Sequence, residues 1–131
     1  MDNGPLVNEE IEAGAELVRE FNHYAPVKAA FWLKKSERAF RYLYIASEKI
    51  DGSNFDLGYG EVLRLVANMN SPYLNPFRVK IVGSQNPLAK AASEISSRYN
   101  GRFATRLGGD FFGGTSVDDV YIYPSPLTIE A

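Results

Sequence analysis

Hydrophobic residues recur along this chain with two spacings, one typical of helices and one typical of strands. The helical spacing, with apolar side chains three or four residues apart, predicts three helices, over residues 8–23, 57–69 and 87–99. The alternating spacing predicts a β-hairpin and three further strands, over residues 27–47, 77–84, 102–107 and 117–123.

These elements follow one another in the order α-β-β-α-β-α-β-β. Such an order predicts an α+β (mixed α/β) fold, with about five strands in a mixed sheet and three helices packed against it. We expect a single domain over 1–131, with an ordered core over about 8–124 and flexible termini. The order of the strands within the sheet does not follow from the sequence.

The hairpin predicted over 27–47 carries apolar groups on both faces. With a period of two residues, Phe31 and Leu33 share one face, whereas Trp32 lies on the other. We therefore expect at least part of this hairpin to be covered on both sides.

Composition excludes several chemistries. The 131 residues contain no cysteine and a single histidine, His23, which excludes disulfides, thiolate nucleophiles and multi-histidine metal sites. The net charge of −2 gives no chain-wide attraction to nucleic acid or anionic lipid. No apolar run is long enough to span a membrane, and the N-terminus is acidic where a signal peptide is basic. We therefore predict a cytoplasmic protein.

Charge is unevenly distributed, and the hairpin is basic. Between Lys28 and Lys49 the chain has six basic and two acidic residues, a local charge of +4 against −6 elsewhere. Trp32 shares a face with Lys28 and Lys34, which suits base stacking beside phosphate-neutralising cations. The candidate binding residues of the hairpin are Lys28, Trp32, Lys34, Lys35, Arg38 and Arg41. The alternative is that Trp32 packs beneath a helix while the lysines line a solvated turn.

A second candidate is the glycine-rich stretch RLGGDFFGGTSVDDVYIY over 106–123, in which Phe111 and Phe112 lie between two glycine pairs. If exposed, the two rings form a contact surface for a partner. The simpler interpretation is a hairpin turn whose glycines adopt positive φ. A phosphate-binding loop does not fit, because these glycines precede a strand whereas phosphate cradles open a helix.

Carboxylates near this loop support an alternative function, a metal-dependent hydrolase or nuclease. Asp110, Asp118 and Asp119 are its candidate metal ligands, since such enzymes need convergent carboxylates. The stretch RLGGDFF also resembles the Gly-Gly-Asp-Glu-Phe hairpin of diguanylate cyclases, which implies nucleotide and magnesium binding. Phe111 stands where that family has its key acid, and this departure argues against cyclase activity. The leading interpretation includes no metal and no cofactor.

The run AAFWLKKSERAFRYLYIAS is similar to a hairpin in a group of small bacterial proteins of unassigned function. The likeness includes the later stretch VKIVGSQNPLAKAA and extends over most of 8–124. Glu48 stands where those relatives often have proline. The resemblance implies a bacterial cytoplasmic protein and brings no catalytic residues.

These observations favour a non-catalytic binding or interaction module over an enzyme. We expect it to contact a protein partner or nucleic acid through the hairpin 27–47, with Phe111 and Phe112 as further contacts. We expect no association with a membrane. The sequence leaves open whether the chain forms a homodimer through a sheet edge or the hairpin.

Overall fold

A computed structural model of the chain describes residues 6–98, 104–108 and 111–124. Of the predicted flexible ends, residues 1–5 and 125–131 lie outside the described residues, whereas Leu6 is buried in the core. The described elements are α1 (Asn8–Tyr24), β1 (Ala29–Lys34), β2 (Arg41–Ser47), α2 (Phe55–Met69), η1 (Pro76–Arg78), β3 (Val79–Gly83), α3 (Pro87–Arg98), β4 (Thr105–Gly108), β5 (Phe111–Phe112), β6 (Thr115–Ser116) and β7 (Asp119–Ile122).

The main sheet is mixed and has β1 at its centre. Its strand order is β3-β2-β1-β7-β4, so β3 and β4 are the edge strands. The neighbouring pairs are antiparallel except β2 and β3, which run parallel. The central strand pairs Trp32 with Leu43 on one side and with Tyr121 on the other. The predicted α+β class, with three helices and a mixed sheet, is confirmed.

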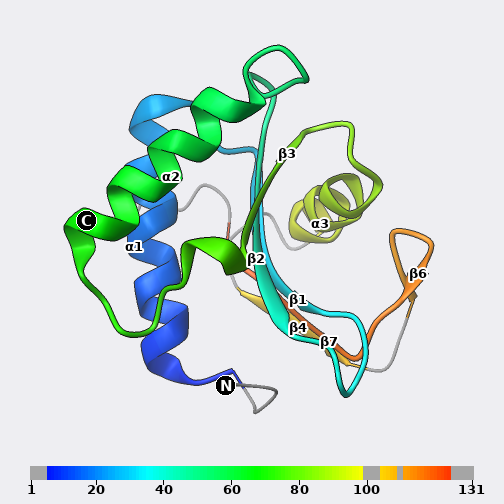
Figure 1. Ribbon diagram of the computed structural model, residues 1–131. Helices are drawn as coiled ribbons and strands as arrows, with labels where there is room; N and C mark the ends of the chain where they lie inside the picture. The colour runs from blue at the N-terminus through cyan, green and yellow to red at the C-terminus, as the bar shows by residue number, and fades with distance from the viewer. Residues whose placement is uncertain (1–5, 99–103, 109–110, 125–131) are drawn as a thin grey trace.

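Helices cover both faces of this sheet and give a three-layer arrangement. The helices α1 and α2 lie on one face, and α3 lies on the other, beside the small β5–β6 hairpin (Figure 1). Two hydrophobic clusters fill the spaces between the layers. In β1, Trp32 belongs to the α1–α2 cluster, whereas Phe31 and Leu33 belong to the α3 cluster. The prediction that the hairpin is covered on both sides is therefore confirmed for β1.

Helix boundaries follow local hydrogen bonds. Asn86 caps α3 as its side-chain oxygen accepts hydrogen bonds from the backbone N–H groups of Leu88 at 2.9 Å and Ala89 at 3.3 Å. At α1, the cap position is taken by Val7, whose side chain has no polar atom. The backbone N–H of Val7 donates a hydrogen bond to Glu10 Oε1 at 3.1 Å. A carboxylate of the first helical turn thus provides the acceptor for the backbone N–H of the cap residue.

The glycine-rich stretch forms an extra hairpin that the predicted element order omits. The short strands β5 and β6 pair with each other, joined by Gly113 and Gly114, which have φ angles of 59° and 81°. The expected turn with positive φ is thus present in the backbone. A side chain at Gly113 would also lie 2.9 Å from the carbonyl oxygen of Pro87, so the turn packs closely against the start of α3.

The third strand is shorter than predicted because a 3-10 helix precedes it. The side chain of Asn75 accepts a hydrogen bond from the backbone N–H of Phe77 at 2.9 Å and caps η1. The strand β3 therefore begins at Val79 rather than at Phe77. Within the described ranges, no helix is both long and apolar enough to cross a lipid bilayer.

Candidate functional site

Trp32, the predicted stacking residue, belongs to the core. Only 5% of its surface is exposed, and its indole N–H donates a hydrogen bond to the Tyr123 hydroxyl at 2.9 Å. That hydroxyl donates in turn to the carbonyl oxygen of Ile11 at 2.6 Å, so the chain of hydrogen bonds links β1 to α1. Base stacking needs an exposed ring, so the interpretation of Trp32 as a stacking residue is wrong and packing beneath a helix is correct.

Tyr123 is buried, and its hydroxyl is tightly packed against α1. Gly14 on α1 faces it so closely that an added side chain would clash with the hydroxyl. Burial raises the pKa of Tyr123 well above its ordinary range, and the hydrogen bond from Trp32 offsets only part of this effect. The site is therefore a tight structural contact between α1 and the sheet.

Two predicted binding cations hold the hairpin to the segment that follows the glycine loop. Lys34 is buried and forms an ion pair with Asp118, at 3.8 Å. Arg41 is mostly buried and its guanidinium lies 3.2 Å from a carboxylate oxygen of Asp119. In this arrangement both cations and both carboxylates serve contacts within the fold.

The other hairpin cations are accessible. Lys35 and Arg38 are exposed in the turn between β1 and β2. Lys28 is exposed at the other end of β1, where it forms an ion pair with Glu48 at 3.7 Å. The six predicted cationic and aromatic residues of the hairpin therefore do not share one surface.

The expected aromatic contact at the glycine loop is wrong for Phe112. Its side chain is 2% exposed and meets the ring of Phe31 edge-on, with the centroids 5.5 Å apart. For Phe111 only the backbone is described, and Asp110 lies outside the described residues. Phe112 thus extends the core beneath α3.

The alternative metal site has no support in the described part of the chain. No group of three or more histidine, aspartate or glutamate side chains there could hold a metal ion. Asp118 and Asp119 face Lys34 and Arg41 instead. A metal-dependent hydrolase that also uses Asp110 stays a prediction.

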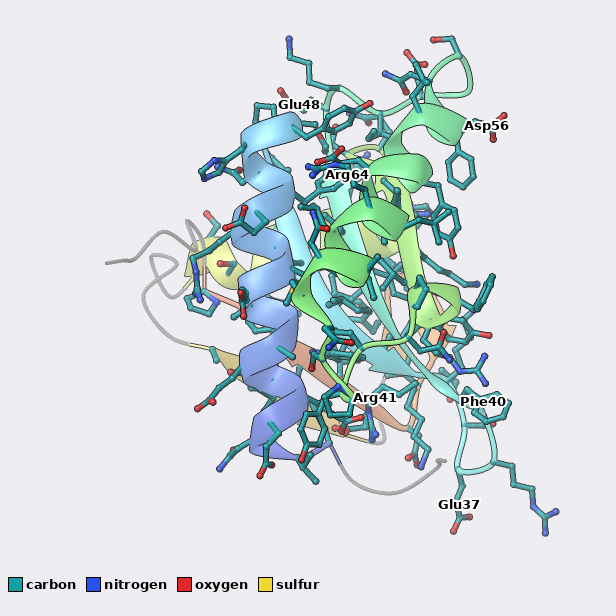
Figure 2. All side chains as sticks on the ribbon, turned by 60° about the vertical axis from the view of Figure 1, so that its left-hand side comes forward. Glu37, Phe40, Arg41, Glu48, Asp56 and Arg64 are labelled. Carbon is teal, nitrogen blue, oxygen red and sulfur yellow. The ribbon has the colours of Figure 1, made fainter. Side chains whose placement is uncertain are left out.

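An aromatic and cationic surface does exist, at the edge of the sheet. The guanidinium carbon of Arg78 lies 3.7 Å from the centroid of the Phe40 ring, and Lys80 Nζ lies 4.7 Å from that of Tyr42. Phe40 is 46% exposed and Lys80 is exposed, while Tyr42 and Arg78 are partly so. We call these four residues the aromatic–cation strip. Figure 2 shows Phe40 beside the hairpin turn that carries Glu37.

Strand pairing produces this strip. The register of β2 and β3 places Lys80 beside Tyr44, and alternation puts the side chains of Tyr42, Tyr44 and Lys80 on the α3 face of the sheet. Arg78 ends η1, directly before β3, and reaches the ring of Phe40. Among the described carboxylates, none lies within ion-pair distance of Arg78 or Lys80.

Further aromatic rings lie on the other side of the edge strand. Phe77 is 72% exposed, the largest value among the described large hydrophobic residues. Phe55 and Tyr59 on α2 stack in parallel with their centroids 6.3 Å apart, and the Tyr59 hydroxyl donates to the carbonyl oxygen of Pro76 in η1. We call Phe55, Tyr59 and Phe77 the aromatic rim. The strip lies on the α3 face of β3, and α2, which carries Phe55 and Tyr59, packs against β3 and η1 from the other face.

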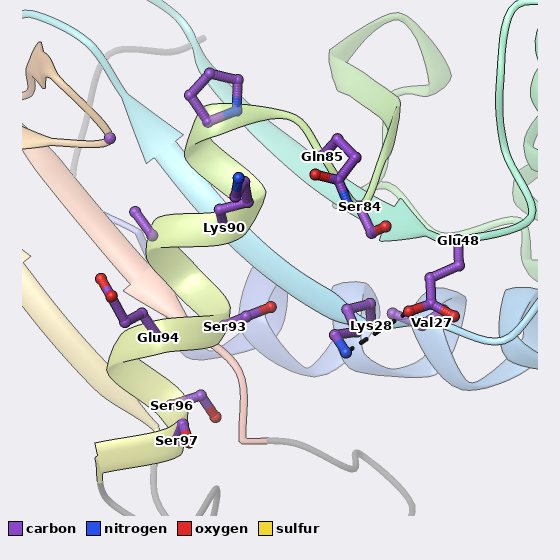
Figure 3. Close-up of a pocket in the computed structure, with 13 residues that line it drawn as sticks. Val27, Lys28, Glu48, Ser84, Gln85, Lys90, Ser93, Glu94, Ser96 and Ser97 are labelled. Carbon is purple, nitrogen blue, oxygen red and sulfur yellow. Dashed lines mark ion pairs between the residues drawn. The ribbon is translucent and has the colours of Figure 1, made fainter.

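A polar groove lies along α3 (Figure 3). Its described lining combines charges of both signs with hydroxyl groups, including those of Lys28, Glu48, Lys90, Glu94, Ser93 and Ser97. Ser96 also lines it, and its Oγ is buried without a hydrogen-bond partner. The lining includes no histidine that could activate a serine, so the groove offers no Ser-His arrangement.

Comparison with protein-family models, with curated proteins and with solved structures gave no match to this chain. The bacterial origin implied by the resemblance of residues 29–47 therefore stays a prediction, as does the cytoplasmic location.

Proposed function

We propose that this protein is a non-catalytic binding module that binds an anionic partner through the aromatic–cation strip. The observation that carries the proposal is the pair of cations, Arg78 and Lys80, held over the rings of Phe40 and Tyr42 and in no ion pair with a described carboxylate. Of the other exposed cations in the described part of the chain, Lys28 and Arg64 each form an ion pair with a glutamate.

The rings prepare these cations for binding. A guanidinium or ammonium over an aromatic face gains cation–π attraction and loses side-chain freedom before a partner arrives. An anion that binds there meets a largely preformed arrangement, so less ordering entropy is lost on association. Arg78 also retains planar N–H donors that match a carboxylate or phosphate.

The charge on the rest of the surface would direct an anionic partner toward the strip. On α1, on the opposite face of the sheet, the chain carries five acidic side chains, Glu9, Glu10, Glu12, Glu16 and Glu20. An anionic partner is repelled from this face and attracted to the strip. The strip can therefore recognise an anion even though the whole chain has a net charge of −2.

The test compares two double variants that remove the same charge. Arg78→Gln/Lys80→Gln removes the cations of the strip, and Lys28→Gln/Lys90→Gln removes two exposed cations beside the polar groove. Fluorescence anisotropy of a labelled Glu-Val alternating peptide and of a labelled oligothymidylate measures binding.

We expect the strip variant to lose about tenfold or more in affinity for at least one probe, since two charge-assisted hydrogen bonds are removed. We expect the control variant to bind within about twofold of the natural chain. Equal losses in both variants, or no binding of either probe to the natural chain, would overturn the proposal.

A further inference from the structure

We infer that the partner is an extended peptide segment, alternating acidic and apolar residues, that adds a strand to the free edge of β3. This inference rests on the proposed function and names its partner. Among the strands that the structure describes, β3 is an edge strand whose neighbour is β2. In a parallel pair, alternate residues of a strand direct their N–H and C=O groups away from the neighbour. These groups can pair with a further extended chain.

The side chains that flank this edge differ between its two faces. Lys80 and Val82 point to the α3 face, where the strip lies, whereas Val79 and Ile81 belong to the cluster beneath α1 and α2. On that second face α2 packs against β3 and η1, and the Tyr59 hydroxyl donates to the carbonyl oxygen of Pro76, the neighbour of the exposed Phe77.

An added strand would present alternate side chains to these two faces. Residues on the α3 face meet Arg78 and Lys80, so acidic side chains fit there. Residues on the α2 face meet Phe55 and Phe77, so apolar side chains fit there. The edge therefore selects a segment in which acidic and apolar residues alternate.

A nucleic acid fits this surface less well. Sequence-tolerant binding of single strands depends on aromatic faces on which bases stack. The only tryptophan, Trp32, is buried, and cations already lie over the rings of Phe40 and Tyr42. The edge of β3 offers a row of backbone donors and acceptors at the spacing of an extended peptide.

A second copy of the chain fits less well too. Two β3 strands paired edge to edge would bring both copies of Arg78 and Lys80 to the same seam. Within the described part of one chain, neither cation forms an ion pair with a carboxylate that could offset this repulsion. Lysine on an edge strand is a known device against such self-pairing, and it leaves an acidic strand as the favoured neighbour.

N-methylated peptides test the strand addition separately from the charge. The parent probe is acetylated, amidated Glu-Val-Glu-Val-Glu-Val. One variant is N-methylated at every glutamate and the other at every valine, so both keep all charges but lose N–H donors on opposite edges. In a strand added to β3, only one of these edges faces the protein.

We expect one N-methylated peptide to bind within about threefold of the parent and the other to lose about tenfold or more. We also expect backbone amides of β3 to gain protection from hydrogen exchange when the parent peptide binds, while those of the covered strand β1 change little.

Equal binding by both methylated peptides would overturn strand addition. If Arg78→Gln/Lys80→Gln still weakened that binding, the proposed function would stand. Binding of oligothymidylate but not of the peptide would overturn the peptide inference alone. A dimer in sedimentation experiments that Lys80→Glu abolishes would show that β3 pairs with a second copy, and would also overturn it.

Discussion

The two strands of the β1–β2 hairpin have similar composition but different surroundings. In β1, Trp32 lies next to Lys34, and both are buried, the tryptophan against Tyr123 and the lysine near Asp118. Around the start of β2, Phe40 and Tyr42 lie on either side of Arg41 in the sequence, yet Phe40 is 46% exposed. The β1 half belongs to the core, and the β2 half contributes to the strip.

The difference arises from position in the sheet. β1 is the central strand, with a strand on either side and a layer on each face. β2 is separated from solvent only by the edge strand β3, which supplies Lys80 to the open surface. A basic and aromatic segment is therefore a binding surface only where the fold leaves its side chains uncovered.

Truncation of Trp32 gives the largest expected effect on stability. We expect Trp32→Ala to lower the free energy of unfolding by about 3–5 kcal/mol, because it leaves a cavity and removes the donor to Tyr123. Urea denaturation followed by circular dichroism measures the loss. Trp32→Phe, which keeps most of the apolar volume, serves as the milder companion. A loss below about 1 kcal/mol in Trp32→Ala would place the indole outside the core.

Loss of the Arg41–Asp119 contact has the next largest expected effect. Asp119→Asn should lower the free energy of unfolding by about 2 kcal/mol, since a hydrogen-bonded ion pair with little exposure is broken. The matched control is Glu61→Gln, which breaks an ion pair with Arg64, a side chain that is 59% exposed. This control should lower the free energy of unfolding by at most about 0.5 kcal/mol. Equal costs would contradict a structural role for Asp119.

Alkaline pH should destabilise the fold through Tyr123, whose hydroxyl links Trp32 of β1 to Ile11 of α1. The pKa of this buried phenol is raised in the folded state, so above the unfolded value near pH 10 the unfolded chain ionises first. Stability is then present below about pH 10 and falls by about 1 kcal/mol between pH 10 and pH 11. Denaturation midpoints across this range measure the slope. Tyr123→Phe should show a shallower decline, and an unchanged slope would contradict the assignment.

The strip should show the smallest effect on stability. Lys80→Gln removes an exposed side chain that makes no described ion pair, so the free energy of unfolding should change by at most about 0.5 kcal/mol. Urea denaturation of this variant beside Trp32→Ala provides the comparison. A loss near 2 kcal/mol would show that Lys80 stabilises the fold and is not held ready for a partner.

Local chemistry allowed much of the fold to be predicted. The spacing of apolar residues indicated the three helices and the hairpin, and the glycine pairs indicated the turn that Gly113 and Gly114 form. The start of α1 could not be assigned from a capping side chain, because the carboxylate of Glu10, inside the helix, accepts the hydrogen bond from the backbone N–H of Val7.

The candidate site could not be predicted in the same way. Phe40 and Tyr42 meet Arg78 and Lys80 only because β3 pairs with β2 in parallel, and local spacing carries no information on that pairing. The burial of Trp32 likewise depends on β1 lying at the centre of the sheet. The sequence does contain one signal of the strip. Arg78 and Lys80 are two residues apart, as are Phe40 and Tyr42, and this matching spacing becomes informative once the strand order is known.

The central claim is that β1 of the hairpin belongs to the core while the start of β2 contributes to the binding surface. A titration with the Glu-Val peptide, followed in proton–nitrogen correlation NMR spectra, tests this claim most directly. The indole N–H of Trp32 gives a unique signal because the chain has one tryptophan. We predict that the amide signals of Tyr42, Lys80 and their neighbours shift while the indole signal stays in place. A shift of the indole signal with unchanged signals from β3 would contradict the assignment of Trp32 to the core and of the binding surface to the edge.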